Sequence, residues 1–374
     1  MINRVLRYEI EKHLNKQKVT LLLGARRVGK TELLNTIYQK NKDITLWLDG
    51  EDVLVEKMLE ERSVSNYSRV LEGYKLLIID EAQYIRDISR KAKLMIDKIK
   101  PLHIILTGSS AFDLVQMGEP LTGRTITYHL FPLSQEEWQQ NENPLQTKQN
   151  LESRLVFGSY PELSTISTQK EKQKYLNESV NIYLLKDILV FEKVRNAKRL
   201  KDLLVLLAHQ IGSEVSSNEL GRQLGMSKNT VERYLDLFQK SFIIYPLTGY
   251  SNNLRKEVTK SKKWYFYDNG IRNALTGNFQ PLSVRNDTGE LWEQYILNER
   301  MKYNIYRDKH MQYFFWRTYD GQEIDLIEMH NGKLFAFECK WRNKKVKPPR
   351  AFVKNYPDAT FETVHQDNYQ KFIT

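Results

Sequence analysis

The chain has 374 residues, of which 41% are hydrophobic and 28% charged, and it carries a formal net charge of +11. At roughly 150 residues per domain this length predicts two or three domains and excludes a single small one. No apolar run approaches the ~18 residues that span a bilayer, and residues 1–14 lack the continuous apolar core of a secretory signal. The single Cys339 excludes an internal disulfide. We therefore expect a cytoplasmic protein without a membrane partner.

The first third of the sequence alternates short apolar runs with longer helical patterns. The continuous apolar character of the runs is typical of strands buried on both faces, and the stretches between them are long enough for crossover helices. The pattern therefore predicts an α/β core built on a parallel sheet. The strands are expected at 19–23, 44–48, 76–79 and 103–106.

Between the first of these strands and the next helical stretch, residues 24–31 fit the phosphate-binding loop pattern. The glycines let backbone N–H groups converge on phosphate oxygens, and the following helix N-terminus adds partial positive charge. Lys30 is expected to reach the β- and γ-phosphates of ATP, and Thr31 to ligate magnesium. The residues predicted to bind the nucleotide here are Gly24, Ala25, Arg26, Arg27, Val28, Gly29, Lys30, Thr31 and Glu32.

A second phosphate element follows fifty positions after Lys30, where the apolar residues 76–79 lead into Asp80 and Glu81. Ligands of open α/β sheets lie at the carboxyl ends of the strands, so this acidic pair is expected beside the loop. Asp80 would hold magnesium, directly or through water, and Glu81 would orient or deprotonate the attacking water. Paired with the loop, the two carboxylates favour ATP hydrolysis over binding alone.

Two further residues are candidates for the same chemistry. The next strand ends in a run of hydroxyl residues, of which Ser109 is predicted to contact the γ-phosphate or the water, with a helix cap as the alternative. Arg124 is expected on an exposed loop. Presented to the site of a neighbouring subunit, it would stabilise charge on the γ-phosphoryl group; an ordinary surface arginine is the alternative.

After the first third, the polar and aperiodic stretch 141–150 predicts a surface connection. Apolar residues at three- and four-residue spacing then predict helices over 175–192 and 200–211. A further polar stretch at 278–288 precedes the last segment.

The excess positive charge lies in the middle of the chain. Residues 170–263 hold 18 Lys and Arg against 10 Asp and Glu, a net charge of +8, whereas residues 1–169 and 264–374 carry only +1 and +2. This distribution suggests a polyanionic partner for the middle segment, with a solvated basic face as the alternative.

Within the basic segment, residues 216–235 predict a helix-turn-helix whose two short helices join at Gly225. Strand-like runs at 242–247 and 264–267 flank a basic loop, as the wing of a winged helix would. A protein-contact or lid module is the alternative to nucleic-acid binding. The residues predicted to contact DNA, on the second helix, are Lys228, Asn229, Thr230 and Arg233.

Near the C-terminus, strands are expected at 313–316, 323–328 and 333–341. Alternation sends Glu338 and Lys340 to one face, where Asp325 from the neighbouring strand can join them. Two carboxylates can bind a divalent cation, and the lysine can act on the water that attacks a phosphodiester; an ion pair without metal is the alternative. Glu290 or Glu293, on an upstream amphipathic helix, would add a ligand.

Taken together, these motifs resemble a family of prokaryotic ATPases with an AAA-type N-terminal domain and an uncharacterised C-terminal region. The likeness covers nearly the whole chain and includes the segments 157–162 and 263–270, while Glu32 departs from the small or hydroxyl residue of many such loops. It implies an α/β fold with a P-loop AAA-type ATPase core at 1–165, a helical and winged helix-turn-helix domain at 166–275, and a restriction-endonuclease-like α/β domain at 276–374. It also implies a homo-oligomer, such as a hexamer, with ATP sites between subunits.

The function predicted from these features is that of an ATP-hydrolysing, DNA-binding oligomer, a motor or remodeller of duplex or branched DNA, for example in branch migration. Branched DNA enters by analogy, because an AAA module before a winged helix is similar in layout to bacterial motors at four-way junctions. Two alternatives stay open. The spacing of Glu338 and Lys340 favours an ATP-regulated, metal-dependent DNA nuclease, and the absence of an obvious second sensor motif favours a non-catalytic, ATP-dependent regulatory switch.

Overall fold

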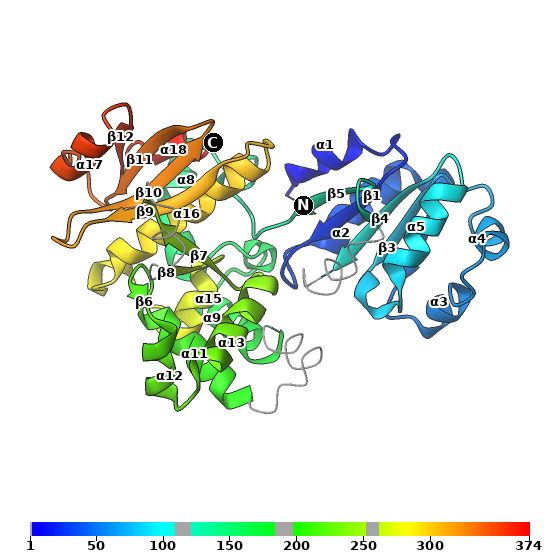
Figure 1. Ribbon diagram of the computed structural model, residues 1–374, viewed down its shortest axis with the longest axis horizontal. Coiled ribbons are helices and arrows are strands. Elements are labelled where there is room, and N and C mark those ends of the chain that lie inside the picture. The colour runs from blue at the N-terminus through cyan, green and yellow to red at the C-terminus, as the bar shows by residue number, and fades with distance from the viewer. Residues whose placement is uncertain (1, 109–120, 184–196, 252–261) are drawn as a thin grey trace. The chain divides into compact units, whose positions relative to one another are not determined.

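The computed structural model describes residues 2–108, 121–183, 197–251 and 262–374, and these residues form two compact units (Figure 1). The first unit comprises Met1–Phe131 and Lys240–Phe242, and the second comprises Pro132–Gln239 and Ile243–Thr374. In the four described ranges, no helix is both long enough and apolar enough to cross a lipid bilayer.

A five-stranded parallel sheet forms the centre of the first unit, in the strand order β2-β3-β4-β1-β5. Every residue of β1, β3 and β4 is buried, as the continuous apolar runs predict. The predicted parallel α/β core is thus confirmed, with strand ends within two residues of those expected. The strands are β1 (Val19–Leu23), β2 (Thr45–Asp49), β3 (Leu76–Asp80), β4 (His103–Gly108) and β5 (Thr125–His129).

Five helices accompany this sheet in the described part of the first unit, and Figure 1 shows α2 and α5 beside it. α5 buries Ile88, Ala92, Met95 and Ile96, whose spacing of three and four residues forms one apolar stripe. The helices are α1 (Leu6–Glu11), α2 (Lys30–Lys40), α3 (Val53–Met58), α4 (Val64–Val70) and α5 (Ile88–Lys98).

The second unit contains a seven-stranded mixed sheet in the order β12-β11-β10-β9-β7-β8-β6. β7 pairs in parallel with β9, so strands on both sides of the predicted domain boundary at 275 belong to one sheet. The division at 165 and 275 stays a prediction. The strands are β6 (Glu214–Val215), β7 (Ile244–Gly249), β8 (Lys262–Phe266), β9 (Gln312–Arg317), β10 (Glu323–His330), β11 (Lys333–Cys339) and β12 (Thr360–Val364).

Helices of very different lengths surround this sheet. The longest of those described, α16, buries Trp292 completely together with polar side chains such as Gln294 and Asn304. The helices are α7 (Gln135–Gln139), α8 (Pro144–Phe157), α9 (Gln169–Glu178), α11 (Ala197–His209), α12 (Ser217–Leu224), α13 (Lys228–Lys240), α15 (Asn269–Thr276), α16 (Thr288–Ile305), α17 (Arg350–Asn355) and α18 (Tyr369–Ile373).

The structure corrects the prediction of a surface connection at 141–150, because α8 begins inside that stretch. The Asn143 side chain accepts a hydrogen bond from the backbone N–H of Gln146, and the Gln146 side chain accepts one from the backbone N–H of Asn143. With Pro144 at the first helical position, this is a strong helix start. The polarity that suggested a loop belongs to a capping box.

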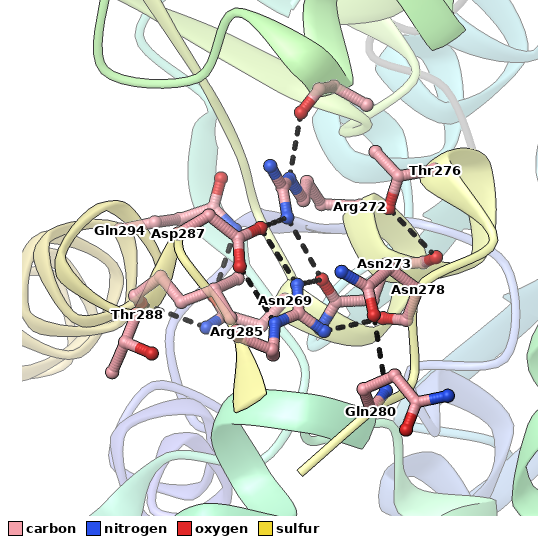
Figure 2. Close-up of polar contacts among 12 residues, drawn as sticks. Asn269, Arg272, Asn273, Thr276, Asn278, Gln280, Arg285, Asp287, Thr288 and Gln294 are labelled. Carbon is pink, nitrogen blue, oxygen red and sulfur yellow. Dashed lines mark hydrogen bonds and ion pairs between the residues drawn. The ribbon is translucent and has the colours of Figure 1, made fainter. Parts of the chain in front are cut away.

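The polar stretch 278–288 is held by a network of buried side chains, shown in Figure 2. Asp287 accepts hydrogen bonds from Arg285, at 2.8 Å, and from Arg272 of α15. Both arginines also bond to Oδ1 of Asn273, at 3.2 Å from Arg272 and 2.9 Å from Arg285. The network ties the segment before α16 to α15.

The two segments that carry the family likeness without a predicted chemical role, 157–162 and 263–270, pack directly on each other. Asp268 accepts a hydrogen bond from the backbone N–H of Ser159 at 2.7 Å. A Cβ atom at Gly158, whose φ is +78°, would lie 2.0 Å from Oδ1 of Asp268, and one at Gly270 would lie 2.0 Å from the Phe157 carbonyl oxygen. The glycines are required for close packing around one buried carboxyl group.

Candidate functional site

The phosphate-binding loop, residues 24–29, connects the end of β1 to the start of α2. Gly29 is the N-cap of α2 and has a φ of 93°, in the left-handed region that favours glycine. A Cβ atom at Gly24 would lie 2.2 Å from the carbonyl oxygen of Leu130. Both glycines of the motif are thus required by the local backbone, which places the loop against the N-terminus of α2.

Lys30 opens α2 and is only 5% exposed. Its Nζ donates hydrogen bonds to the carbonyl oxygens of Gly24 and Ala25, at 3.0 and 3.1 Å. The ammonium group therefore lies within the loop, next to a helix N-terminus. Together these features concentrate positive charge where phosphates bind best.

The loop and the acidic pair meet at Thr31 and Asp80. The hydroxyl of Thr31 donates a hydrogen bond to Oδ2 of Asp80 at 2.7 Å, and the hydroxyl of Thr107 donates one to Oδ1. The geometry follows from the sheet order, because β1, β4 and β3 are parallel neighbours whose carboxyl ends share one edge.

Glu81 follows Asp80 in a left-handed conformation with a φ of 48°. Its backbone N–H donates to the Thr107 hydroxyl at 2.8 Å, and its Oε2 accepts a hydrogen bond from Nε2 of Gln83 at 2.5 Å. Sequence reasoning treated Thr107 as one of several hydroxyl candidates and did not consider Gln83. The only signal for Gln83 was its place two residues after the acidic pair.

The donor set at this edge fits magnesium. Mg²⁺ takes oxygen ligands, is held by one or two protein groups, and completes its shell with phosphates and water. Thr31 and Asp80 offer a hydroxyl and a carboxylate oxygen that already lie 2.7 Å apart. These two residues would hold the ion, as the sequence predicts.

The remaining residues of the predicted nucleotide set have varied surroundings. Arg26 donates to the hydroxyl of Tyr84 at 3.0 Å, which links the loop to the segment after β3. Val28 is fully buried, Arg27 has a φ of 62°, and Glu32 is exposed in the first turn of α2. Ser109 lies outside the described residues.

Arg124 directly precedes β5, at the amino ends of the parallel strands, whereas the loop follows their carboxyl ends. Its Nε donates to Oδ1 of Asp97 at 2.6 Å, and the side chain is 40% exposed. The structure therefore does not bring Arg124 to the phosphate-binding loop of its own chain. Its action in a neighbouring subunit stays a prediction.

The predicted DNA-contacting residues lie in the first two turns of α13. Ser227 accepts a hydrogen bond from the backbone N–H of Thr230 at 3.2 Å, and Gly225 ends α12 with a φ of 62°. Lys228, Asn229 and Arg233 are exposed, and Lys228 forms an exposed ion pair with Glu232. A shallow cavity of about 700 Å³ lies over the turn between the two helices.

The C-terminal carboxylates come together across β10 and β11. Asp325 is 8% exposed and accepts a hydrogen bond from the backbone N–H of Cys339 at 2.8 Å, and Glu338 pairs with Lys340 at 2.6 Å. Burial raises the pKa of both carboxyl groups, and the charge of Asp325 raises that of Glu338 further. Burial opposes the charge of Lys340, but the bond to Glu338 outweighs it and raises the lysine pKa.

Two further residues join this cluster. Glu293 of α16, one of the two additional ligands that the sequence offered, has a pKa raised to about 8 by burial and by the charge of Asp325. Lys263 of β8, which is 2% exposed, contacts Glu323 and lies 3.9 Å from Glu293. The sequence places Lys263 at the end of the predicted basic loop and gives no indication that it would contact these carboxylates. Among the described residues, no group of three or more His, Cys, Asp or Glu side chains is placed to hold a metal ion.

Three sequence families match consecutive parts of the chain. Residues 16–139 match the AAA domain, and residues 148–282 and 288–369 match two domains of unknown function, DUF8612 and DUF4143. An uncharacterised protein of Mycobacterium tuberculosis is 26% identical over 337 residues, which cover 88% of this chain and 72% of that protein. One of Methanocaldococcus jannaschii is 22% identical over 404 residues, covering 99% of this chain and 89% of that one.

Two solved structures show weaker likeness. A signal transduction ATPase with numerous domains from Pyrococcus horikoshii has a TM-score of 0.30 at 14% identity over 83% of this chain, which spans 48% of that structure. The Thermotoga maritima RuvB branch migration motor has a TM-score of 0.32 at 15% identity, over 65% of this chain and 89% of the motor. Scores this low carry no argument about function. The match to the AAA domain spans both phosphate motifs and all five strands of the parallel sheet, so residues 16–139 are similar to an AAA domain in sequence and contain its phosphate-binding elements.

Proposed function

We propose that this protein hydrolyses ATP with magnesium and couples the hydrolysis to DNA binding. The observation that carries the first half is the contact of Thr31 with Asp80, which joins the phosphate-binding loop to the acidic pair. A glycine turn without a ligand would not need a buried carboxylate, 7% exposed, at its side.

In this proposal each residue of the site has a separate task. Lys30 and the N-terminus of α2 neutralise the β- and γ-phosphates. Thr31 and Asp80 would hold magnesium, which would draw charge away from the phosphate oxygens. Glu81 takes the proton of the attacking water, and the hydrogen bond that it accepts from Gln83 holds its carboxylate in position.

The DNA half of the proposal is supported by α13. Its exposed Lys228, Asn229 and Arg233 lie at the start of a helix whose apolar side is buried in the second unit. Short hydrogen-bonding side chains at the start of a recognition helix meet base edges, and the cations meet phosphates. The net charge of +8 over residues 170–263 strengthens the attraction to a polyanion.

We further propose that the protein acts as a homo-oligomer that moves or remodels duplex or branched DNA. In this proposal Arg124, which is exposed, paired with Asp97 and remote from its own loop, would act at the ATP site of another copy of the chain. The oligomer is tested by light scattering with and without ATP, and Arg124→Ala should lower ATP turnover without lowering ATP binding.

The test of hydrolysis compares two lysine variants of α2. Lys30→Ala should abolish ATP turnover, whereas Lys40→Ala, at the far end of the same helix, should leave it unchanged. Turnover is measured alone and with duplex, single-stranded and four-way-junction DNA, and the length of the DNA products is recorded on the same samples. If Lys30→Ala still hydrolyses ATP at the wild-type rate, the proposed role of the phosphate-binding loop is wrong.

A second function, metal-dependent DNA cleavage, is favoured by one observation. Asp325 is a buried carboxyl group whose charge raises the pKa of the partly buried Glu338 beside Lys340, and two carboxylates so placed can bind a divalent cation. Glu338→Gln should then abolish cleavage and leave ATP turnover intact, with Glu362→Gln on the neighbouring β12 as the control. Cleavage that persists in Glu338→Gln would leave the cluster as internal ion pairs.

A further inference from the structure

A separate pocket of about 620 Å³ lies in the first unit, between α3 and the start of α5. It is lined by three acidic side chains and five basic ones, so its walls carry a net charge of +2. The basic residues are Lys57, Arg62, Arg86, Arg90 and Lys91. The pocket follows β3, and its lining includes no residue of the phosphate-binding loop.

Lys91 is the buried member of this set, with 6% of its surface exposed. Its ammonium group makes no hydrogen bond or ion pair with any residue in the described ranges. Burial lowers the pKa of Lys91, although the charges of Glu56, Asp87 and Glu60 oppose the change. None of these three carboxylates forms an ion pair with the ammonium group, so Lys91 can still bind the charge of an anionic ligand.

The start of α5 points to the same kind of ligand. Asp87 is the N-cap of this eleven-residue helix, in the left-handed conformation, and its side chain accepts no hydrogen bond from the first turn. The helix N-terminus is therefore without a side-chain cap and keeps its partial positive charge. Arg86, Arg90 and Lys91 add three cations within the same turn and its edge.

We propose that this pocket is a second anion site, which binds a phosphate group through Lys91, the rim arginines and the start of α5. A phosphate is favoured over a carboxylate because it carries up to two charges against walls of net charge +2, and because guanidinium groups bind its oxygens in pairs. The phosphate can come from a small molecule or from a nucleic-acid backbone. The proposal does not depend on ATP hydrolysis or on α13.

The test uses the full chain with Lys30→Ala, so that the phosphate-binding loop does not contribute. Binding of inorganic phosphate is measured by calorimetry in this background and after addition of Lys91→Met or Lys93→Met, the latter being a lysine of the same helix outside the pocket. Lys91→Met should weaken binding at least about tenfold, and Lys93→Met should not change it. Equal binding in both, or no binding in the background, would overturn the proposal.

A chemical measurement on the unaltered chain decides the matter if Lys91→Met fails to fold. Pyridoxal 5′-phosphate forms an imine with the lysine amine as water leaves, and borohydride reduces the C=N bond to a stable amine that peptide mapping locates. Labelling at Lys91 that inorganic phosphate suppresses supports the site, and labelling that phosphate leaves unchanged, or none at all, contradicts it. Stronger suppression by duplex DNA than by inorganic phosphate would assign the phosphate to nucleic acid, and the reverse to a small molecule.

Discussion

Thr107 and Glu81 are joined by a hydrogen bond of 2.8 Å, from the backbone N–H of the glutamate to the threonine hydroxyl. The same hydroxyl donates a hydrogen bond to Oδ1 of Asp80. One side chain of β4 thus positions both members of the acidic pair, and Asp80 in turn accepts from Thr31. The positions of the predicted catalytic carboxylates therefore depend on Thr107, a residue that need not contact the nucleotide.

Thr107→Val tests this arrangement. The variant keeps the shape of the side chain but removes the hydroxyl that bonds to both the Glu81 N–H and Oδ1 of Asp80, which then keep only their mutual hydrogen bond of 3.2 Å. We expect a loss of about 1–3 kcal/mol in the free energy of unfolding. The displaced carboxylates should lower kcat for ATP about ten- to hundredfold. Urea unfolding and ATP turnover measure the two effects.

Thr20→Val provides the control for that variant. Thr20 is also fully buried in the same sheet, and its hydroxyl bonds to Nε2 of His103 at 3.0 Å. Thr20→Val should lower the free energy of unfolding by a similar amount and leave kcat for ATP unchanged. An equal fall in kcat in both variants would assign the effect to the sheet and not to the acidic pair.

Replacement of Lys228 and Arg233 by alanine tests the proposed DNA surface of α13. Removing two phosphate contacts should weaken duplex binding and reduce the slope of log K against log salt by about two. Fluorescence anisotropy at several salt concentrations measures both quantities. Lys198 and Lys201 on α11, replaced together, remove the same charge elsewhere in the second unit. If both double variants bind alike, the DNA surface lies elsewhere.

Asp287 should make the second unit sensitive to acid. Burial opposes its ionisation, but the hydrogen bonds from Arg285 and Arg272 outweigh burial and lower its pKa to about 2. Because the folded-state pKa lies below the unfolded value of about 3.9, the stabilisation is complete above pH 4 and is lost as the pH falls toward 2. Asp287→Asn should cost about 3–5 kcal/mol at pH 7, because it removes the negative charge that balances two buried arginines, which keep only their hydrogen bonds to neutral groups such as Asn273.

Urea unfolding followed by tryptophan fluorescence measures this loss, since five of the six tryptophans lie in the second unit. The gap in the free energy of unfolding between the wild type and Asp287→Asn should shrink as the pH falls from about 4 to about 2. Asp358→Asn, at an exposed position, serves as the control and should show no gap. A gap that stays constant with pH would contradict the ion pair.

The first unit was predictable because its signals are local and its geometry is general. The apolar runs of β1, β3 and β4 mark buried strands, and parallel neighbours bring the ends of β1 and β3 to one edge. The contact of Thr31 with Asp80 follows from those two facts. Thr107 and Gln83 could not be placed in the same way, because sequence order does not tell which hydroxyl or amide points at a carboxylate.

The second unit was less predictable because its sheet joins strands from distant parts of the chain. β7 pairs with β9 across the connection that contains α15 and α16, so β7 and β8, which the sequence suggested as strands of a wing, share one sheet with the C-terminal strands. That pairing brings Lys263 to the carboxylate cluster, where no spacing rule would place it. The start of α8 at Asn143 was missed for a different reason. The polar residues of a capping box have the composition of a loop, and only their hydrogen bonds distinguish the two.

Asp268 should respond to pH in the direction opposite to Asp287. Burial raises its pKa to about 6, although the backbone N–H of Ser159 favours the charged form. With a folded-state pKa above the unfolded value of about 3.9, stability falls as the pH rises from 4 to 6, by at most about 3 kcal/mol, and is constant above that range.

Asp268→Asn lacks this dependence, so the free energy of unfolding of the wild type should exceed that of the variant by a larger margin at pH 4 than at pH 7. Urea unfolding at both pH values measures the margin, with Asp320→Asn as an exposed control. A margin that is equal at the two pH values would mean that the packing of Gly158 and Gly270 leaves Asp268 charged throughout, with the Ser159 hydrogen bond outweighing burial.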